Sequence, residues 1–192
     1  NFPLAPANTA AAGTPLNWNH NFQNNPYWVL ETNRNTFSKD RLIGNVDLTS
    51  QLTDDLSLST KLGVDSFSQF TTNRQAVGSN NAQDGSYAQS QRRFEEVNAS
   101  FLLNYNKNFS EDFGFSFSLG GNHMNRTYDR LSGSLPGLEL PDLYSLSNLQ
   151  TGSTANISNY HSDQQINSFY GYGQFSYKDM FFLDFTGRND WS

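Results

Sequence analysis

The chain has 192 residues and no cysteine, and its 12 basic and 18 acidic side chains give a formal net charge of −6. The absence of cysteine excludes disulfides and thiolate metal sites, and the acidic balance argues against nucleic acid, whose phosphates are held by clustered Lys and Arg. Aromatic residues make up 15% of the chain despite a mean hydropathy of −0.66, which is more than a disordered chain carries. A membrane β-barrel combines low mean hydropathy with many aromatics, because its strands alternate lipid-facing and lumen-facing residues.

Residues 1 to about 38 are rich in Asn, Ala, Thr and Pro. Proline disfavours a helix, so we predict an extended loop over 1–38 and a partial transmembrane β-barrel over 39–192. The prolines are Pro3, Pro6, Pro15 and Pro26, and the loop also carries the aromatic residues Trp18, Phe22, Tyr27 and Trp28.

From Lys39 the pattern changes to an alternation with a period of two residues. One face of the first strand carries Leu42, Gly44, Val46, Leu48 and Leu52, and the same face of the next carries Leu56, Leu58, Thr60, Leu62 and Val64. Polar residues occupy the positions between them, and the two runs are separated by a short turn at 53–55. The pattern predicts a β-hairpin with one apolar and one polar face.

Two more hairpins repeat this pattern. In the second, Val97–Tyr105 and Phe113–Gly121 flank a turn near 110–112. In the third, Phe169–Tyr177 and Phe181–Gly187 flank a turn near 178–180. Six strands and little helix are therefore expected, with an all-β, antiparallel arrangement.

The connections between strands alternate in length. The hairpin turns are short, whereas the joins between hairpins, roughly 71–91 and 127–165, are long and polar, as in outer-membrane barrels. Strands of about 11 residues tilted by about 40° span roughly 28 Å, close to the ~25 Å apolar band of such barrels. A soluble β-sandwich also has alternating strands, but these tend to be about five or six residues long.

Four segments resemble the SusC/RagA family of TonB-linked outer-membrane transporters. They are NNPYWVL (Asn24–Leu30), KDRLIGNVDLTSQLTDDLSLSTKLGVD (Lys39–Asp65), NASFLLNYNKNFSEDFGFSFSLGGN (Asn98–Asn122) and INSFYGYGQFSYKDMFFLDFTGRNDWS (Ile166–Ser192). The resemblance covers most of the chain and weakens in the long loops. It implies that this chain is an internal segment of a barrel of about 22 strands, whose plug and TonB-binding region belong to the rest of the protein.

The resemblance also implies a location and partners. The protein would lie in the lipid of the bacterial outer membrane and pair with a SusD-like surface lipoprotein. Together they would import an oligosaccharide or peptide, with energy passed through TonB. No nucleic-acid partner and no cofactor are expected.

No catalytic constellation stands out, so an enzyme is not expected. The histidines His20, His123 and His161 lack the spacing of metal ligands, and no metal site is expected. An enzyme on a small barrel would need a Ser/His or carboxylate cluster at its rim. A structural or adhesive barrel without energised transport is the alternative to a transporter.

Candidate substrate-binding residues lie on the inward-facing side of the third hairpin. They are Tyr170, Tyr172, Asp184 and Arg188. Asp184 and Arg188 are four residues apart on one strand, so both face inward and would contact solute, plug or each other.

Alternation also places Arg92 and Glu96 on the inner face, where a solvated rim is the simpler interpretation. Trp18, Tyr27, Trp28 and Tyr87 fall in expected outer loops, where they would stack on sugar rings or pack against other loops or the lipoprotein.

Overall fold

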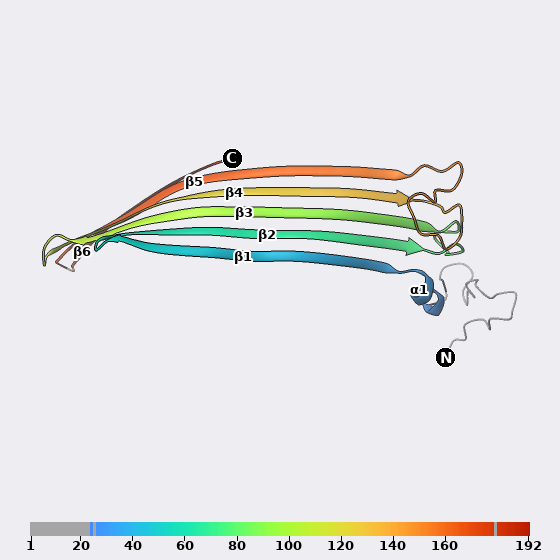
Figure 1. The fold of residues 1–192 in the computed structure, drawn as a ribbon, viewed down its shortest axis with the longest axis horizontal. Coiled ribbons are helices and arrows are strands. Elements are labelled where there is room, and N and C mark those ends of the chain that lie inside the picture. Colours follow the sequence, from blue (N-terminus) through green and yellow to red (C-terminus); the bar gives the residue numbers. More distant parts are fainter. Residues whose placement is uncertain (1–23, 25, 179) are drawn as a thin grey trace. The chain divides into compact units, whose positions relative to one another are not determined.

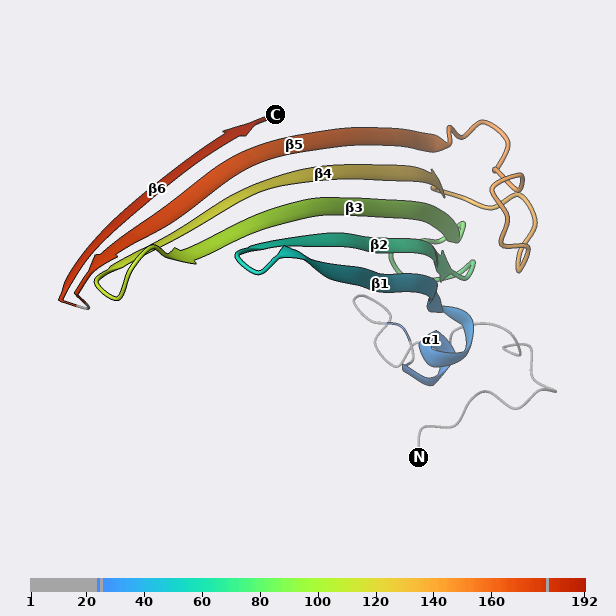
Figure 2. The same ribbon diagram turned by 60° about the vertical axis from the view of Figure 1, so that its left-hand side comes forward.

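The computed structural model describes residues 24, 26–178 and 180–192. These residues form α1 (Pro26–Thr32), β1 (Asn35–Thr53), β2 (Leu56–Gln75), β3 (Ser86–Asn108), β4 (Phe113–Leu135), β5 (Asn156–Tyr177) and β6 (Phe181–Trp191). The strands form one antiparallel sheet in which strands that follow each other in the sequence lie side by side, from β1 to β6 (Figures 1 and 2). The expected all-β fold with little helix is confirmed.

The hairpin turns lie where the alternation places them. β1 and β2 are joined through Asp54 and Asp55, and β3 and β4 through residues 109–112. The third turn follows Tyr177, and Lys178 adopts a positive φ of 54° there, a conformation that tight turns use to reverse the chain. Asp179 lies outside the described residues.

The strands are longer than the predicted 11 residues or so. β2 to β5 have 20 to 23 residues each, and the joins shrink to residues 76–85 and 136–155. The expectation of loops over 71–91 and 127–165 is therefore wrong at both ends of each loop. These polar stretches lack the apolar alternation that marks a strand in the sequence, but cross-strand pairing extends the strands when neighbouring strands supply hydrogen bonds.

The stretch predicted as an extended loop contains a helix. α1 spans Pro26–Thr32 and β1 already begins at Asn35, so the expectation of an extended chain through residue 38 is wrong over these residues. Proline is compatible with the first helical position, because the N–H that it lacks has no intrahelical partner there. Residues 1–23 and 25, which include Trp18, His20 and Phe22, lie outside the described residues.

The helix is tied to the 76–85 connection by side-chain hydrogen bonds. The Asn33 Oδ1 atom accepts a hydrogen bond from the Ala76 N–H at 2.7 Å, and the Asn33 Nδ2 atom donates to the Ser79 Oγ atom at 3.2 Å. Ala76 and Ser79 are both buried, as is Trp28 on α1. Trp28 is therefore a packing residue, one of the two roles expected for it.

The chain divides into two compact units. We call the first the loop unit; it comprises the chain up to Asp40 with Ser68–Arg93 and Asp129–Tyr160. The second, the turn unit, comprises Arg41–Phe67, Phe94–Tyr128 and His161–Ser192. Strands β2 to β5 each contribute residues to both units.

The loop unit has a small hydrophobic core. Tyr87, Leu135 and Leu138 are buried, and side chains of the 136–155 connection pack on them. Tyr87 therefore lies in β3 and not in an outer loop, and it packs against Tyr144 with 6.3 Å between ring centroids.

No helix in the described part of the chain is long and apolar enough to cross a membrane.

Candidate functional site

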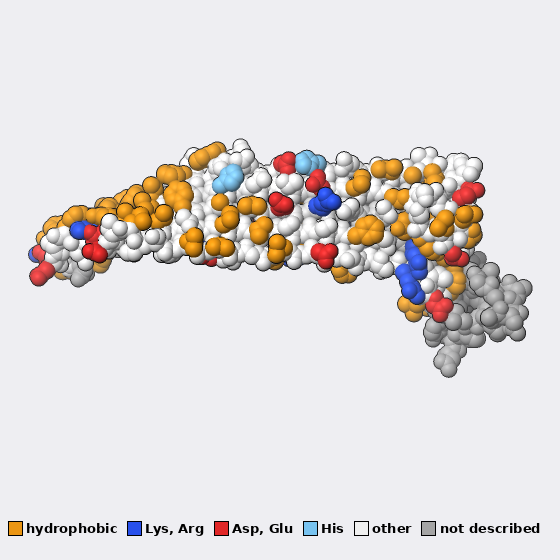
Figure 3. All heavy atoms as spheres, in the orientation of Figure 1, with side chains coloured by type: hydrophobic (Ala, Val, Ile, Leu, Met, Phe, Trp, Pro, Cys, Tyr) orange, Lys and Arg blue, Asp and Glu red, His pale blue; other side chains and the backbone are white. Residues whose placement is uncertain are grey.

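One face of the turn unit carries aromatic and aliphatic side chains. The ring centroid of Phe113 lies 5.7 Å from that of Phe175 and 4.6 Å from that of Tyr177, and Phe117 lies 6.4 Å from Phe185. Figure 3 shows hydrophobic side chains at the surface over the strands near the tight turns. Phe113 thus pairs with two residues of its neighbouring strand β5, and aromatic pairs of this kind stabilise a sheet. Phe117 reaches Phe185 on β6 across β5, where Gly171 and Gly173 have no side chain, so this face is continuous across β4, β5 and β6.

The apolar stretch covers only part of each strand. On β4 it runs for about nine residues, Phe113–Gly121, although the strand has 23 residues. The next residue on that face, His123, hydrogen-bonds through Nδ1 to the Asn167 Oδ1 atom of β5 at 2.6 Å. A strand that crosses a bilayer needs about 9–11 residues, so the apolar stretch has the length of one crossing.

The opposite face of the turn unit is polar, and its charged side chains pair across neighbouring strands. Arg41 on β1 donates two hydrogen bonds to Asp65 on β2, at 2.9 and 2.7 Å. Arg126 on β4 donates to Glu96 on β3 at 2.7 Å. Solvated pairs of this kind contribute little to folding, but they compensate charge along a wet surface.

The predicted residues Asp184 and Arg188 both lie on this polar face, each with a different partner. Arg188 donates to both carboxylate oxygens of Asp190, at 3.0 and 2.9 Å, and to the Ser168 Oγ atom at 3.3 Å. Asp184 accepts a hydrogen bond from Gln174, its register partner on β5, at 2.7 Å. The pairing of Asp184 with Arg188 is therefore wrong, because residues four apart on a strand are separated by about 13 Å.

Tyr170 and Tyr172 lie beside these residues on β5. Tyr170 is the register partner of Arg188, and the Arg188 guanidinium carbon lies 5.5 Å from the centroid of its ring. The Tyr170 ring also lies over Gly120 of β4, where an added Cβ would meet it at 2.5 Å. Tyr172, opposite Thr186, is half-exposed. The register thus brings Tyr170 and Arg188 together, whereas Asp184 and Tyr172 each face a different neighbour.

Sequence reasoning missed an aromatic contact inside the polar face. Phe67 on β2 stacks on Phe94 on β3 with 5.2 Å between ring centroids. The guanidinium of Arg126, the partner of Glu96, lies 5.9 Å from the Phe94 centroid. Alternation places both Phe67 and Phe94 on the polar face. Two aromatic residues at inward-facing positions of adjacent strands could therefore have predicted this contact from the sequence.

The polar face ends near the tight turns in an open hollow of about 430 Å³. Lys107 and Asp55 form an ion pair there. The lining is otherwise mostly neutral and polar: Asn106, Asn108, Gly114, Phe115, Ser116, Gln174 and Ser176. Such a surface suits hydrated contacts better than packing against lipid.

The two described histidines take part in local hydrogen bonds. His123 contacts Asn167, and the His161 Nε2 atom lies 2.8 Å from an Asp163 oxygen. Among residues 24, 26–178 and 180–192, no group of three or more His, Asp or Glu side chains is arranged to hold a metal ion. The lack of a metal site in the whole protein stays a prediction.

Comparison with known proteins finds similar solved structures. No protein-family model matches the chain, and no curated protein matches its sequence. The structure of the RagAB peptide transporter matches with a TM-score of 0.70 and 22% identity over 86% of this chain. The RagAB peptide importer matches in its 'open-open' state with a TM-score of 0.71 and 20% identity over 86% of this chain, and in its 'closed-closed' state with 0.68 and 21% over 81%.

The chain spans only 18–19% of the length of these transporter chains. At 20–22% identity the likeness establishes the fold. The six-stranded antiparallel sheet is thus the fold of part of a RagAB peptide transporter chain, which confirms at the level of fold the resemblance to the SusC/RagA family.

Proposed function

We propose that this chain is part of a bacterial outer-membrane transporter of the SusC/RagA type. In this proposal the apolar face of the turn unit contacts lipid, and the polar face lines the interior of a larger barrel. The observation that carries it is the apolar stretch of about nine residues, Phe113–Gly121 on β4, backed by a polar face on the same strand. Alternation of this kind over about ten residues is typical of a transmembrane β-barrel.

The proposed solute is an oligosaccharide or a peptide. The matched solved structures are described as a peptide transporter and importer, which supports import as the activity. The compensated charges of the polar face, such as Arg41 with Asp65 and Arg126 with Glu96, suit passage of a hydrated solute. The residues proposed to contact this solute on the inner wall of the barrel remain Tyr170, Tyr172, Asp184 and Arg188.

The proposed partners are a SusD-like surface lipoprotein and TonB. The 136–155 connection supports a docking role, because Leu140 and Leu143 are exposed there at 57% and 47%. Affinity purification of the full-length protein from native membranes should recover a lipoprotein in similar abundance. Repeated recovery of the barrel protein alone would contradict this partner.

Topology and energised uptake are the decisive tests. An epitope inserted at Gly152, whose positive φ of 87° marks an exposed turn, should be labelled on intact cells. The same epitope between Asp54 and Asp55 should be labelled only after permeabilisation. Uptake of fluorescent oligosaccharides and peptides should require the full-length gene and stop when a protonophore is added. Correct topology without energised uptake would favour a structural or adhesive barrel.

A further inference from the structure

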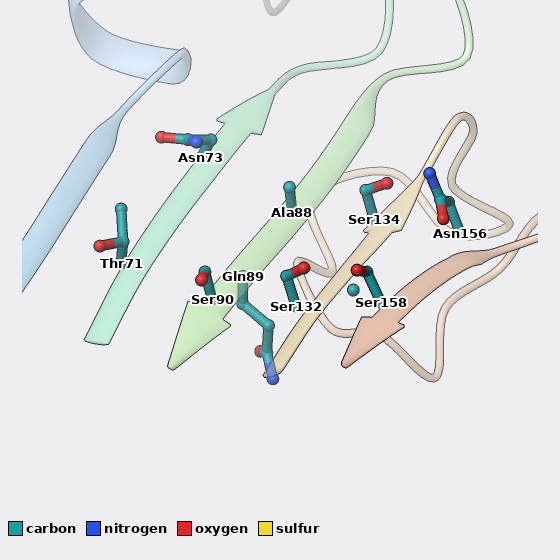
Figure 4. Close-up of a pocket in the computed structure, with 10 residues that line it drawn as sticks. Thr71, Asn73, Ala88, Gln89, Ser90, Ser132, Ser134, Asn156 and Ser158 are labelled. Atoms are coloured by element: carbon teal, nitrogen blue, oxygen red, sulfur yellow. The ribbon is translucent and has the colours of Figure 1, made fainter. Parts of the chain in front are cut away.

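The pairing of β3 with β4 can be followed along the polar face from one contact to the next. Arg126 on β4 donates a hydrogen bond to Glu96 on β3 at 2.7 Å. Further along the same two strands, Ser132 and Ser90 line one small polar hollow (Figure 4). From the ion pair to the two serines both strands advance by the same number of residues, so the antiparallel register holds without a bulge.

This register places Arg92 on β3 opposite Arg130 on β4. Each arginine lies two residues from the serine of its own strand that lines the hollow, so both side chains leave the polar face. Both also belong to the loop unit. Opposite residues on antiparallel strands have Cβ atoms about 4.5–5.5 Å apart, so the two guanidinium groups can reach the same ligand.

Neither arginine has a carboxylate partner among the residues that the structure describes. Arg92 is exposed, and the guanidinium carbon of Arg130 lies 5.9 Å from the centroid of the Tyr160 ring, a cation–π contact that leaves the positive charge in place. Glu96, the next acid on the polar face of β3, is already bound by Arg126. On the other side, the hollow is lined by no charged side chain.

Two cations that face each other without a carboxylate are unusual on this face of the sheet. Elsewhere on it, Arg41, Arg126 and Arg188 each bind a carboxylate. Like charges directly opposite on adjacent strands destabilise a sheet. A guanidinium offers a planar fork of N–H donors that matches the oxygens of a carboxylate, sulfate or phosphate, so an anion between the two side chains would remove the repulsion.

We propose that Arg92 and Arg130 together bind one oxyanion group of a ligand, a carboxylate, sulfate or phosphate. The two forks hold the oxyanion from adjacent strands, and the contact with Tyr160 helps to position the Arg130 fork. The place of this site on the inner wall of a barrel rests on the proposed function. The inference adds that the preferred ligands of this wall carry a negative charge.

The test is oxyanion binding to the full-length protein in detergent, measured by isothermal titration calorimetry. The probes are inorganic phosphate, sulfate and acetate at constant ionic strength, with chloride as the reference anion. At least one oxyanion should bind better than chloride. Arg92→Gln and Arg130→Gln should each lower its affinity about tenfold or more, because hydrogen bonds to a charged group are lost. Arg92→Lys keeps the charge without the fork and should lower affinity by a smaller factor.

The matched control is Arg93→Gln, which removes the same charge from the next residue of β3. Arg93 is also exposed, and its side chain leaves the opposite face of the strand, so the affinity should be unchanged. Unfolding in urea gives a second measurement, because a ligand that binds the folded state stabilises it. The midpoint should rise with added oxyanion in the unsubstituted protein and in Arg93→Gln, and should rise much less in Arg92→Gln.

The inference is overturned if no oxyanion binds better than chloride, or if Arg92→Gln and Arg93→Gln weaken binding equally. The proposed function fails separately. Oxyanion binding that depends on Arg92 without energised uptake would reject transport and keep the site. Energised uptake by a protein that binds no oxyanion would reject the site alone.

Discussion

Glycines in the turn unit allow aromatic rings to lie against the backbone of a neighbouring strand. A Cβ added to Gly120 would lie 2.5 Å from the Tyr170 ring, and one added to Gly121 would lie 2.6 Å from the Phe101 ring. Gly120 therefore positions Tyr170, which in turn receives the Arg188 guanidinium. The lack of a side chain is the property that matters here, since glycine otherwise weakens a strand.

We expect Gly120→Ala to destabilise the full-length barrel by about 1–3 kcal/mol, the usual cost of forcing extra volume into a packed site. Gly63→Ala on β2 is the matched control, because that strand has both neighbours in the described sheet and a Cβ there meets other atoms only at 4.0 Å. Unfolding in urea, followed in lipid vesicles, measures both. Equal losses from the two substitutions would show that Tyr170 does not occupy the space over Gly120.

Adjacent residues on β4 should respond in opposite ways to a charge. Phe117→Arg places a guanidinium on the aromatic face and should cost about 2–4 kcal/mol if that face meets the bilayer midplane. Ser116→Arg points into the open hollow near the tight turns and should cost far less. Ser118 is an unsuitable control, because it is 5% exposed and donates to the Asn104 Oδ1 atom at 2.7 Å. Refolding yield into vesicles is the measurement, and similar losses at 116 and 117 would contradict the facing assignment.

At the scale of elements, the 136–155 connection is organised around one buried asparagine. Asn148 is 5% exposed; its Nδ2 atom donates to the Leu140 and Leu143 carbonyls at 2.8 and 2.7 Å, and its Oδ1 atom accepts from the Leu140 N–H at 3.0 Å. The three hydrogen bonds of this one side chain satisfy backbone groups that would otherwise pair with a neighbouring strand. The connection is thus folded despite its length.

We expect Asn148→Asp to loosen this connection, because a carboxylate keeps the acceptor but cannot donate to the two carbonyls. Leaving buried polar groups unpaired costs about 1–3 kcal/mol each. Hydrogen exchange of residues 136–155 should become at least tenfold faster, while the turn unit is unchanged. Ser147→Ala, at an exposed neighbour, serves as the control, and unchanged exchange in Asn148→Asp would show that the asparagine does not hold the connection.

At the scale of the whole molecule, the described sheet ends in two edge strands, each paired on one side only. β1 and β6 are the outer strands of the described sheet, and every residue of both is exposed. In lipid, each unsatisfied backbone group costs several kcal/mol, so a spanning sheet must close. Six strands are also fewer than the eight of the smallest common barrels.

Residues 1–192 expressed alone should therefore fail to form a stable monomeric barrel. In water the exposed apolar face, with Phe113, Leu183 and Phe185 among its members, should promote aggregation. Refolding into detergent, followed by gel filtration and a heat-modifiability gel, checks this. Rescue by co-refolding with the remainder of the parent protein is expected. A monodisperse, heat-modifiable monomer would instead indicate a small self-contained barrel.

The sequence by itself determined the hairpins, their turns and the two faces of the sheet. Side chains on a strand alternate between faces whatever lies beside the strand, so Leu42 to Leu62 or Phe113 to Gly121 can be assigned from local order alone. The face of Asp184, Arg188, Tyr170 and Tyr172 followed from the same rule.

Only the tertiary structure decided which residues meet and how far the strands extend. Register is set between strands, so the partners of Arg188 on β5 (Ser168 and Tyr170) and the contact of Arg126 with Glu96 and Phe94 could not be derived from one strand alone. The polar ends of β2 to β5 resemble loops in composition and become strands because neighbouring strands satisfy their backbone hydrogen bonds. A polar hollow of about 150 Å³, lined by residues of β2 to β5 (Figure 4), likewise forms only where four strands align small residues such as Ala88, Ser132 and Ser134.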